Sequence, residues 1–320
     1  MKYLLLTEGA AYFPELLKPF ERAGLYNWLK CFNGEVRLWG DIKKRKHELE
    51  DYDIVHINSY GQDLGLAHEV SQYKQHPKLV VNMDLSINYF DKDMQFPLFI
   101  RDVLAADVLF SVEPTQVNFI NYVASMMNRD RPKKWCTLLP HPIDIPMLID
   151  KAFVDYNERM NAVAIQYHKY DGHWSIPKIL TEKLPHNWLS AMLGYIGDPL
   201  PVEGLRHMVM PYSEWEVYIE FLKRCKIGFE YRTHKAASRF VMEAGALGIP
   251  VVTTKDSHMG QIIYPELCHE IEDFVLMRQS LERLIEDEDW RLHMAREGME
   301  RLEPYNFENS KKKFMEMIEQ

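Results

Sequence analysis

The sequence predicts an α/β protein made of two Rossmann-like, doubly wound domains that face each other across a cleft. Three observations predict this architecture. The chain has 320 residues, more than twice a typical domain of about 150 residues. Short apolar runs with β-branched residues alternate with longer stretches of helical period, which is the pattern of parallel strands covered by helices. Pro140, Pro142 and Pro146 interrupt helix and sheet hydrogen bonding, so an exposed connection is expected between the two halves.

Six strands are expected on each side of this connection. The strands expected in the first half are Tyr3–Leu6, Val36–Trp39, Asp53–Ile57, Leu79–Asn82, Asp107–Ser111 and Cys136–Leu139. Those expected in the second half are Ala162–Gln166, Met192–Ile196, His207–Met210, Ile227–Glu230, Pro250–Thr253 and His269–Ile271. A connecting helix is expected over 114–127, with Val117, Ile120, Val123, Ala124 and Met127 on its apolar face. His56, beside a strand end, is expected to be a packed core imidazole.

The predicted domains are an N-terminal domain over 1–148, a C-terminal domain over 149–302, and a final helix over 303–320 that packs back on the N-terminal domain. The chain after Ile271 is charged and helical in period, and Pro304 interrupts it before the final helix. The acidic run 286–289 is expected to be a solvated turn or a helix start.

Composition excludes several classes of protein. With 47% hydrophobic and 27% charged residues, the chain is neither collagen-like nor of low complexity nor disordered. A net charge of −9 opposes binding to phosphate backbones or anionic lipids as the main mode, although a local basic cleft stays open. The apolar run within Met1–Thr7 is too short for a signal peptide or a membrane span. Four widely separated cysteines without a Cys-x-x-Cys pair indicate reduced, buried thiols, so a cytoplasmic location is expected.

The strongest local signal is the segment 239–252, which contains Glu243. Its small residues favour a helix lying close to a neighbouring strand, and Gly248 suits a left-handed C-cap before the next strand. The start of this helix, near Ser238, would offer free backbone N–H groups to an anion. A nucleotide and a second substrate would suit the cleft between the two domains.

This segment resembles the "Glu-Ala-x-Ala-x-Gly-x-Pro-Val" helix of the GT-B nucleotide-sugar glycosyltransferases, in particular the family-four retaining enzymes. Other landmarks follow in that family's order over nearly the whole chain: Tyr52–His56, Ala105–Val108, Leu139–Asp144 and Met210–Ser213. The resemblance implies the GT-B fold, with an acceptor-side domain over 1–148 and a donor-side domain over 149–302. It also implies a metal-independent transfer of a sugar, such as a hexose, with retention of configuration, from a nucleotide diphosphate sugar, for which UDP is the expected nucleotide; the sugar itself is not named by the sequence. No cofactor is implied, because the nucleotide sugar is a co-substrate.

The resemblance also implies roles for particular residues. Glu243 matches the glutamate that hydrogen-bonds the donor ribose, and Pro211 lies in the segment whose backbone reads the base. Asp84, Lys169 and Lys235 are the candidate catalytic residues. The candidate donor-binding residues are Gly9, His168, His173, Pro211, Arg232, Ser238, Arg239 and Glu243. Cleaving a sugar–diphosphate bond develops negative charge on the leaving phosphate, which cations and helix N-termini stabilise; Asp84 would accept the acceptor's proton or hold a sugar hydroxyl.

The sequence departs from that family at several of these positions. Lys235 stands where the family has a second glutamate, and His168 and His173 stand where it has an arginine and a lysine that bind the diphosphate. Its "Gly-Gly" loop is reduced to Gly9, and its "His-Asp" pair reads Met83–Asp84. Each candidate also has a structural interpretation, as a surface charge, a helix cap or a helix-surface carboxylate.

Two other functions stay open at this point. The departures motivate a catalytically inactive GT-B-like binding or partner protein, and the compact length hints at a phage-type enzyme acting on modified DNA, which the charge of −9 opposes. The acceptor is not named: a glycan, a lipid-linked molecule, a small molecule and modified DNA are all open. No metal site is expected, because neither Asp51-x-Asp53, Asp91-x-Asp93 nor the histidine spacing has a fitting context.

Overall fold

The structure is a computed structural model of the chain. It describes residues 1–9, 23–83, 95–127, 136–152, 154–166, 176, 180–181, 184–195, 207–211 and 215–319. The chain divides into two compact units. Unit 1 contains Met1–Pro142 and Tyr305–Gln320, and unit 2 contains Ile143–Pro304.

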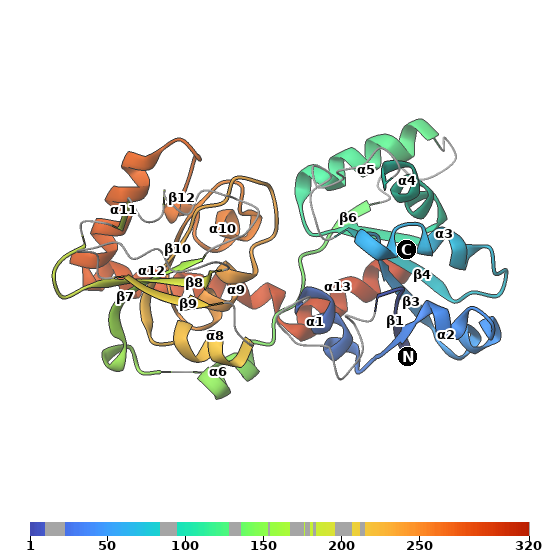
Figure 1. Cartoon of the computed structure of the whole chain (residues 1–320), viewed down its shortest axis with the longest axis horizontal. Helices are drawn as coiled ribbons and strands as arrows, with labels where there is room; N and C mark the ends of the chain where they lie inside the picture. Colours follow the sequence, from blue (N-terminus) through green and yellow to red (C-terminus); the bar gives the residue numbers. More distant parts are fainter. Residues whose placement is uncertain are drawn as a thin grey trace. The chain divides into compact units, whose positions relative to one another are not determined.

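Unit 1 is built on a parallel sheet of six strands in the order β2-β1-β3-β4-β5-β6 (Figure 1). Its strands are β1 (Tyr3–Thr7), β2 (Glu35–Leu38), β3 (Ile54–Asn58), β4 (Lys78–Met83), β5 (Val108–Ser111) and β6 (Cys136–Leu138). Its helices are α1 (Ala23–Phe32), α2 (Trp39–Ile42), α3 (Leu66–Ser71), α4 (Gln95–Ala105), α5 (Pro114–Met127) and α13 (Phe307–Glu319).

Unit 2 is built on a second parallel sheet of six strands, in the order β12-β11-β10-β7-β8-β9. Its strands are β7 (Met160–Gln166), β8 (Leu189–Tyr195), β9 (His207–Pro211), β10 (Cys225–Glu230), β11 (Val251–Thr254) and β12 (Cys268–His269). Its helices are α6 (Ile145–Ala152), α8 (Trp215–Leu222), α9 (Arg239–Ala246), α10 (His258–Ile263), α11 (Phe274–Glu286) and α12 (Glu288–Leu302). All twelve predicted strands are therefore present, with ends that differ by a few residues.

The sheet of unit 1 has an apolar core on each face. Side chains of β1 alternate between the two, because successive residues of a strand point to opposite faces: Leu4 and Leu6 face one core, and Tyr3 and Leu5 face the other. The second core includes helices α1 and α13. The ring of Phe314, in α13, packs against the rings of Tyr3, Trp28 and Phe32. His56 is a core imidazole as predicted: its ring is buried between the Tyr3 hydroxyl and Asn82 Oδ1.

The border between the units differs from the predicted one. The structure divides the chain between Pro142 and Ile143 rather than between residues 148 and 149. The reason is α6, which begins at Ile145 and packs against α9 of unit 2, with Ile143 and Leu148 buried. The second crossing lies between Pro304 and Tyr305, so the helix that ends the chain belongs to unit 1.

Helix α5, the acidic run 286–289 and the cysteines were also predicted from the sequence. Helix α5 has the bounds predicted for it, but Met127, expected on its apolar face, is exposed. Gln116 is buried in this helix, where it accepts a hydrogen bond from Ser111 Oγ at 2.8 Å. In the acidic run, Asp287 caps α12 by accepting from the Trp290 amide at 2.9 Å. The four cysteines are buried thiols, as expected. None of the described helices is long and apolar enough to cross a membrane.

Candidate functional site

The strand order of unit 2 reverses between β7 and β10, which start from the middle of the sheet and lead outward in opposite directions. In open α/β sheets, ligands bind in the crevice outside the carboxyl ends of the strands at such a switch point. Of the two segments that leave this point, the structure describes the one after β10, which runs from Tyr231 to Ser238 and enters α9. This segment and the start of α9 form the candidate site.

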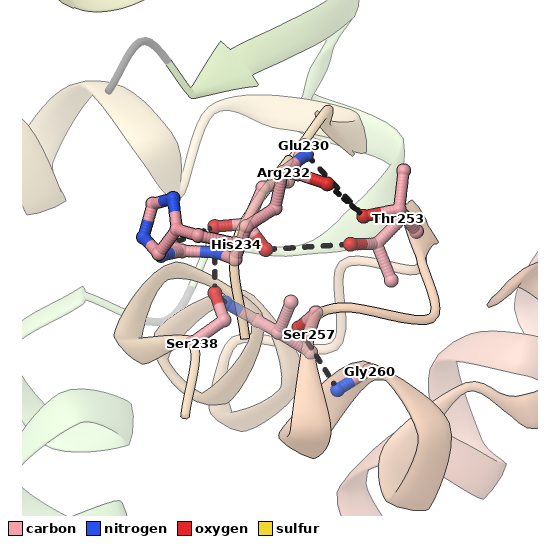
Figure 2. A network of polar contacts seen from close by, with 9 residues as sticks. Glu230, Arg232, His234, Ser238, Thr253, Ser257 and Gly260 are labelled. Carbon is pink, nitrogen blue, oxygen red and sulfur yellow. Dashed lines mark hydrogen bonds and ion pairs between the residues drawn. The ribbon is translucent and has the colours of Figure 1, made fainter. Parts of the chain in front are cut away.

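A buried carboxylate organises the site (Figure 2). Glu230 is the last residue of β10 and only 2% exposed. Its Oε1 accepts from Arg232 Nη2 at 2.7 Å and from Ser238 Oγ at 2.8 Å, and its Oε2 accepts from Thr253 Oγ1 at 3.3 Å. A buried carboxylate requires such partners, because an unpaired charge in this position would be strongly destabilising. Glu230 therefore joins β10, β11 and the start of α9.

The loop between β10 and α9 is fixed at several further points. Thr254 Oγ1 donates to the Arg232 carbonyl at 2.7 Å, and Arg232 Nη1 lies 3.0 Å from His234 Nε2. Ala236 pairs with Ser257 in a parallel bridge, and the His258 amide donates to the Ala236 carbonyl at 2.9 Å. The loop backbone is thus tied to the segment after β11 by contacts within the protein, and such preorganised backbone favours binding of an anion.

Ser238 begins α9 as its N-cap. Its Oγ accepts from the Val241 amide at 3.2 Å while donating to Glu230, so one hydroxyl serves both as cap and as link to the strand. The first amides of a helix have no intrahelical acceptor and carry partial positive charge. The predicted position of a helix N-terminus near Ser238 is therefore confirmed.

The far end of α9 is capped as predicted. Gly248 has φ +64°, the left-handed conformation expected of it. Helix α9 packs against β10 and β11, as expected, and a Cβ added at Gly245 would lie at ordinary contact distance from Ile263 and Leu302, so this glycine faces α10 and α12. The buried guanidinium of Arg159 donates to the Leu247 carbonyl at 2.7 Å and to the Gly248 carbonyl at 3.3 Å. Burial lowers the pKa of Arg159.

Glu243 lies one turn into α9 and is 3% exposed. Trp215 Nε1 donates to Glu243 Oε1 at 2.7 Å, and Arg239 Nε lies 3.1 Å from the same oxygen. Oε2 of Glu243 is buried and accepts no hydrogen bond from the described residues. The phenol of Tyr218 lies beside this carboxylate: burial, then the negative charge of Glu243 and a hydrogen bond to Glu243, raise the pKa of Tyr218. Trp215 and Arg239 therefore hold Oε1, whereas Oε2 accepts no hydrogen bond of good geometry from the described residues.

The predicted cations have different environments. Arg232 is 7% exposed, and its ion pair with Glu230 neutralises it. Arg239 is half-buried and paired with Glu243. Lys235 is exposed and lies near Asp256. Burial raises the pKa of Asp256, and the positive charges of Lys235 and His234 partly offset this rise. Of these three cations, Lys235 is therefore the one that forms no ion pair with the described residues of unit 2.

Several predicted residues lie elsewhere. Asp84, His168, Lys169 and His173 lie outside the described residues. Pro211 is the last residue of β9, where its backbone pairs with Tyr195.

Gly9 follows β1 in unit 1, whose own strand order reverses between β1 and β3. The Gly9 amide donates to Thr7 Oγ1 at 3.0 Å, and Thr7 Oγ1 donates to Asp63 Oδ1 at 2.8 Å. Asp63 also accepts from the Glu8 amide at 2.8 Å. A Cβ at Gly9 would lie 2.8 Å from Oε1 of the exposed Gln62, a flexible side chain. The backbone after β1 is thus held by a carboxylate, as the loop after β10 is.

Three residues that organise these loops were not predicted from the sequence: Glu230, Trp215 and Asp63. The role of Glu230 could have been predicted from the sequence, because a glutamate at the end of an otherwise apolar strand, two residues before an arginine, indicates a buried ion pair. Trp215 and Asp63 act on residues 28 and 56 positions away in the sequence. No group of three or more His, Cys, Asp or Glu side chains in the described ranges could hold a metal ion.

Comparisons with known proteins show the fold. No protein-family model matches the sequence, and no curated protein matches it significantly. HepE from Anabaena in complex with UDP superposes with a TM-score of 0.74 at 13% identity, covering 100% of this chain and 100% of that chain. The trehalose-6-phosphate synthase OtsA superposes with a TM-score of 0.76 at 11% identity, covering 100% and 99%. An alpha-glucosyltransferase in complex with UDP and a 13-mer DNA containing an HMU base gives 0.72 at 15% identity, covering 100% of both chains.

These full-length likenesses define the class of fold: the chain has the two-domain GT-B fold. The fold class predicted from the sequence is confirmed.

Proposed function

We propose that the chain is a glycosyltransferase that transfers a sugar from a UDP-sugar to an acceptor, without a metal ion and with retention of configuration. The GT-B fold supports this, and so do UDP and UDP-glucose in the structures that it resembles. The observation that carries the proposal is Glu243: a buried carboxylate beside the switch point of unit 2 with one oxygen unused by the described residues. Retention rests on the sequence resemblance alone.

In this proposal unit 2 binds the donor. The unused Oε2 of Glu243 accepts from the ribose hydroxyls, and the backbone near Pro211 reads the base. The diphosphate binds at the N-terminus of α9, which begins with Ser238 and Arg239, and Lys235 adds positive charge; the N-cap and the first-turn arginine support this assignment. Arg232 contributes less positive charge than a free arginine, because Glu230 neutralises it. His168, Lys169 and His173, from the segment after β7, complete the phosphate contacts.

In the proposed reaction, one bond to the sugar breaks, another forms, and one proton is transferred. The C1–O bond between the sugar and the β-phosphate breaks, and a bond forms between C1 and the acceptor oxygen. UDP leaves with additional negative charge, which Lys169, Lys235 and the α9 amides stabilise. The acceptor's hydroxyl proton passes to Asp84, next to the end of β4, and Gly9 lets the backbone after β1 approach the donor. The cations thereby take the place of a divalent ion.

The acceptor remains the open part of the proposal. One of the similar structures is an alpha-glucosyltransferase with DNA containing an HMU base. On this chain, the basic run 43–47 of unit 1 is partly neutralised, because Lys43 pairs with Glu69 at 2.6 Å and Arg45 with Glu48 at 2.6 Å. With a net charge of −9, this favours an acceptor other than DNA. DNA containing an HMU base is therefore one arm of the test, beside glycans and small molecules.

The test measures UDP release from UDP-glucose and other UDP-sugars, with and without each acceptor. A glycosyltransferase releases UDP in an acceptor-dependent manner, and metal independence predicts the same rate with EDTA. Nuclear magnetic resonance of the product's anomeric proton reports retention or inversion. Glu243→Gln is expected to reduce kcat/KM by roughly 10- to 100-fold, the value of a charge-assisted hydrogen bond. Glu216→Gln, an exposed glutamate of α8, is the control. UDP binding without release by any acceptor would instead indicate the inactive binding protein.

A further inference from the structure

Trp215 and Arg239 contact the same oxygen of Glu243. Trp215 begins α8, is 6% exposed, and donates its indole N–H to Oε1 at 2.7 Å. Arg239 Nε lies 3.1 Å from Oε1 as well. Oε2 is buried and receives no hydrogen bond from the residues that the structure describes. The two oxygens of one carboxylate are therefore treated differently by the protein.

We propose that Trp215 is a positioning residue for nucleotide recognition, which orients the Glu243 carboxylate so that Oε2 meets the ribose hydroxyls of the donor. This inference rests on the proposed donor role of Glu243. An indole N–H only donates, so the oxygen that it contacts stays an acceptor and the carboxylate plane is held in one orientation. The remaining oxygen then requires a ligand that donates, such as a hydroxyl group. Ribose supplies two neighbouring hydroxyl donors, and a deoxyribose lacks one of them.

Trp215 is better placed for this role than Arg239. The Arg239 side chain is 32% exposed and sits in the first turn of α9, where a diphosphate would attract its guanidinium. Trp215 is buried and has a neutral donor, so a bound phosphate exerts no comparable pull on it. Its helix also follows the segment after Pro211 that we assign to the base. Trp215 thereby connects the chain that follows Pro211 with the carboxylate assigned to the ribose.

The experiment compares the affinities for UDP and for 2′-deoxyuridine diphosphate by isothermal calorimetry on the full chain. Wild type is expected to bind UDP about 10-fold more tightly than the deoxy compound, the value of one hydrogen bond to a charged group. Trp215→Phe keeps an aromatic ring and removes only the N–H. It is expected to weaken UDP binding and to reduce the ratio of the two affinities to about 3 or less. Trp188→Phe makes the same change at a buried tryptophan that packs under Arg291, and should leave the ratio unchanged.

The outcomes separate the inference from the proposed function. No binding of UDP to the wild type overturns the proposed function. Binding of UDP with no preference for it over the deoxy compound overturns the ribose contact of Glu243, and the inference with it. A wild-type preference that Trp215→Phe preserves overturns the inference alone. If Trp215→Phe does not fold, which circular dichroism shows, Trp215→Tyr replaces it, because tyrosine also lacks the indole N–H.

Discussion

Ser238 Oγ donates a hydrogen bond to Glu230 Oε1 at 2.8 Å and thereby joins the end of β10 to the first turn of α9 (Figure 2). The same hydroxyl accepts from the Val241 amide. A strand end, a buried ion pair and a helix start are therefore connected through one atom. This connection fixes the position of the α9 N-terminus, on which the proposed phosphate contacts depend.

Ser238→Ala should destabilise unit 2 by about 2 to 3 kcal/mol, because it removes both an N-cap and one donor to a buried carboxylate. Ser257→Ala is the matched control: Ser257 is also buried and caps α10 by accepting from the Gly260 amide at 3.1 Å. It should cost only about 1 kcal/mol, the usual value of a cap. Urea denaturation followed by tryptophan fluorescence measures both. Equal losses would show that the link to Glu230 contributes nothing.

Removal of the Glu230 charge should leave the buried Arg232 guanidinium without its counter-ion. Glu230→Gln is therefore expected to cost about 3 to 5 kcal/mol of unfolding free energy. The double substitution Glu230→Gln with Arg232→Met should be more stable than Glu230→Gln alone, because the uncompensated charge is gone. A double-mutant cycle in urea gives the coupling. If the two losses simply add, the 2.7 Å contact carries no net interaction.

Asp102 of α4 gives unit 1 a defined pH dependence. Burial raises the pKa of its carboxyl to about 6, against the opposing effect of hydrogen bonds from the His68 and Gly65 amides and from Ser59. A folded-state pKa above the unfolded value means that the folded state binds more protons between about pH 4 and 6. This group's contribution to stability is therefore greatest below about pH 4 and is lost as the pH rises through about 6.

Asp102→Asn removes this titration. Between pH 4 and pH 7 the wild type should lose about 3 kcal/mol of unfolding free energy relative to the variant, the value of about two pKa units. Chemical denaturation of both proteins at each pH gives the difference, in which all other titrating groups cancel. A difference that stays constant across this range would contradict the raised pKa.

Two glycine substitutions should act in opposite directions. Gly248 has φ +64°, so Gly248→Ala should cost about 1 to 2 kcal/mol. A Cβ there would also lie 3.3 Å from Met299 Sδ. Gly40 is exposed within α2 and has no atom within 4 Å of a Cβ added to it, so Gly40→Ala should stabilise by about 0.5 to 1 kcal/mol. Thermal unfolding distinguishes them, and stabilisation by Gly248→Ala would refute the left-handed cap.

Much of this fold could be predicted because it depends on local patterns. Buried parallel strands appear as short apolar runs, and Pro114 marks the start of α5 directly. The border at Pro142 was less predictable, since it depends on which unit buries Ile143 and Leu148. The small residues of α9 predicted a helix close to a strand, which the structure has, but a sequence cannot show that Gly245 also faces Ile263 and Leu302.

The site was predictable only in outline. Ser238 and Glu243 were identified from the pattern of one helix, and both lie where that pattern put them. The partners that decide what Glu243 and Arg232 do are Trp215 and Glu230, which come from other elements. Hydrogen bonds between elements depend on packing, which the order of residues along one helix does not record.

The measurement that tests the central claim most directly is a calorimetric titration of UDP into the wild-type chain and into Glu243→Gln, with Glu216→Gln as control. The account predicts binding by the wild type and the control, and an affinity for Glu243→Gln lower by about 10- to 100-fold. Equal binding by all three proteins would contradict the assigned role of Glu243. No binding of UDP by the wild type would contradict the proposal that unit 2 is the donor domain.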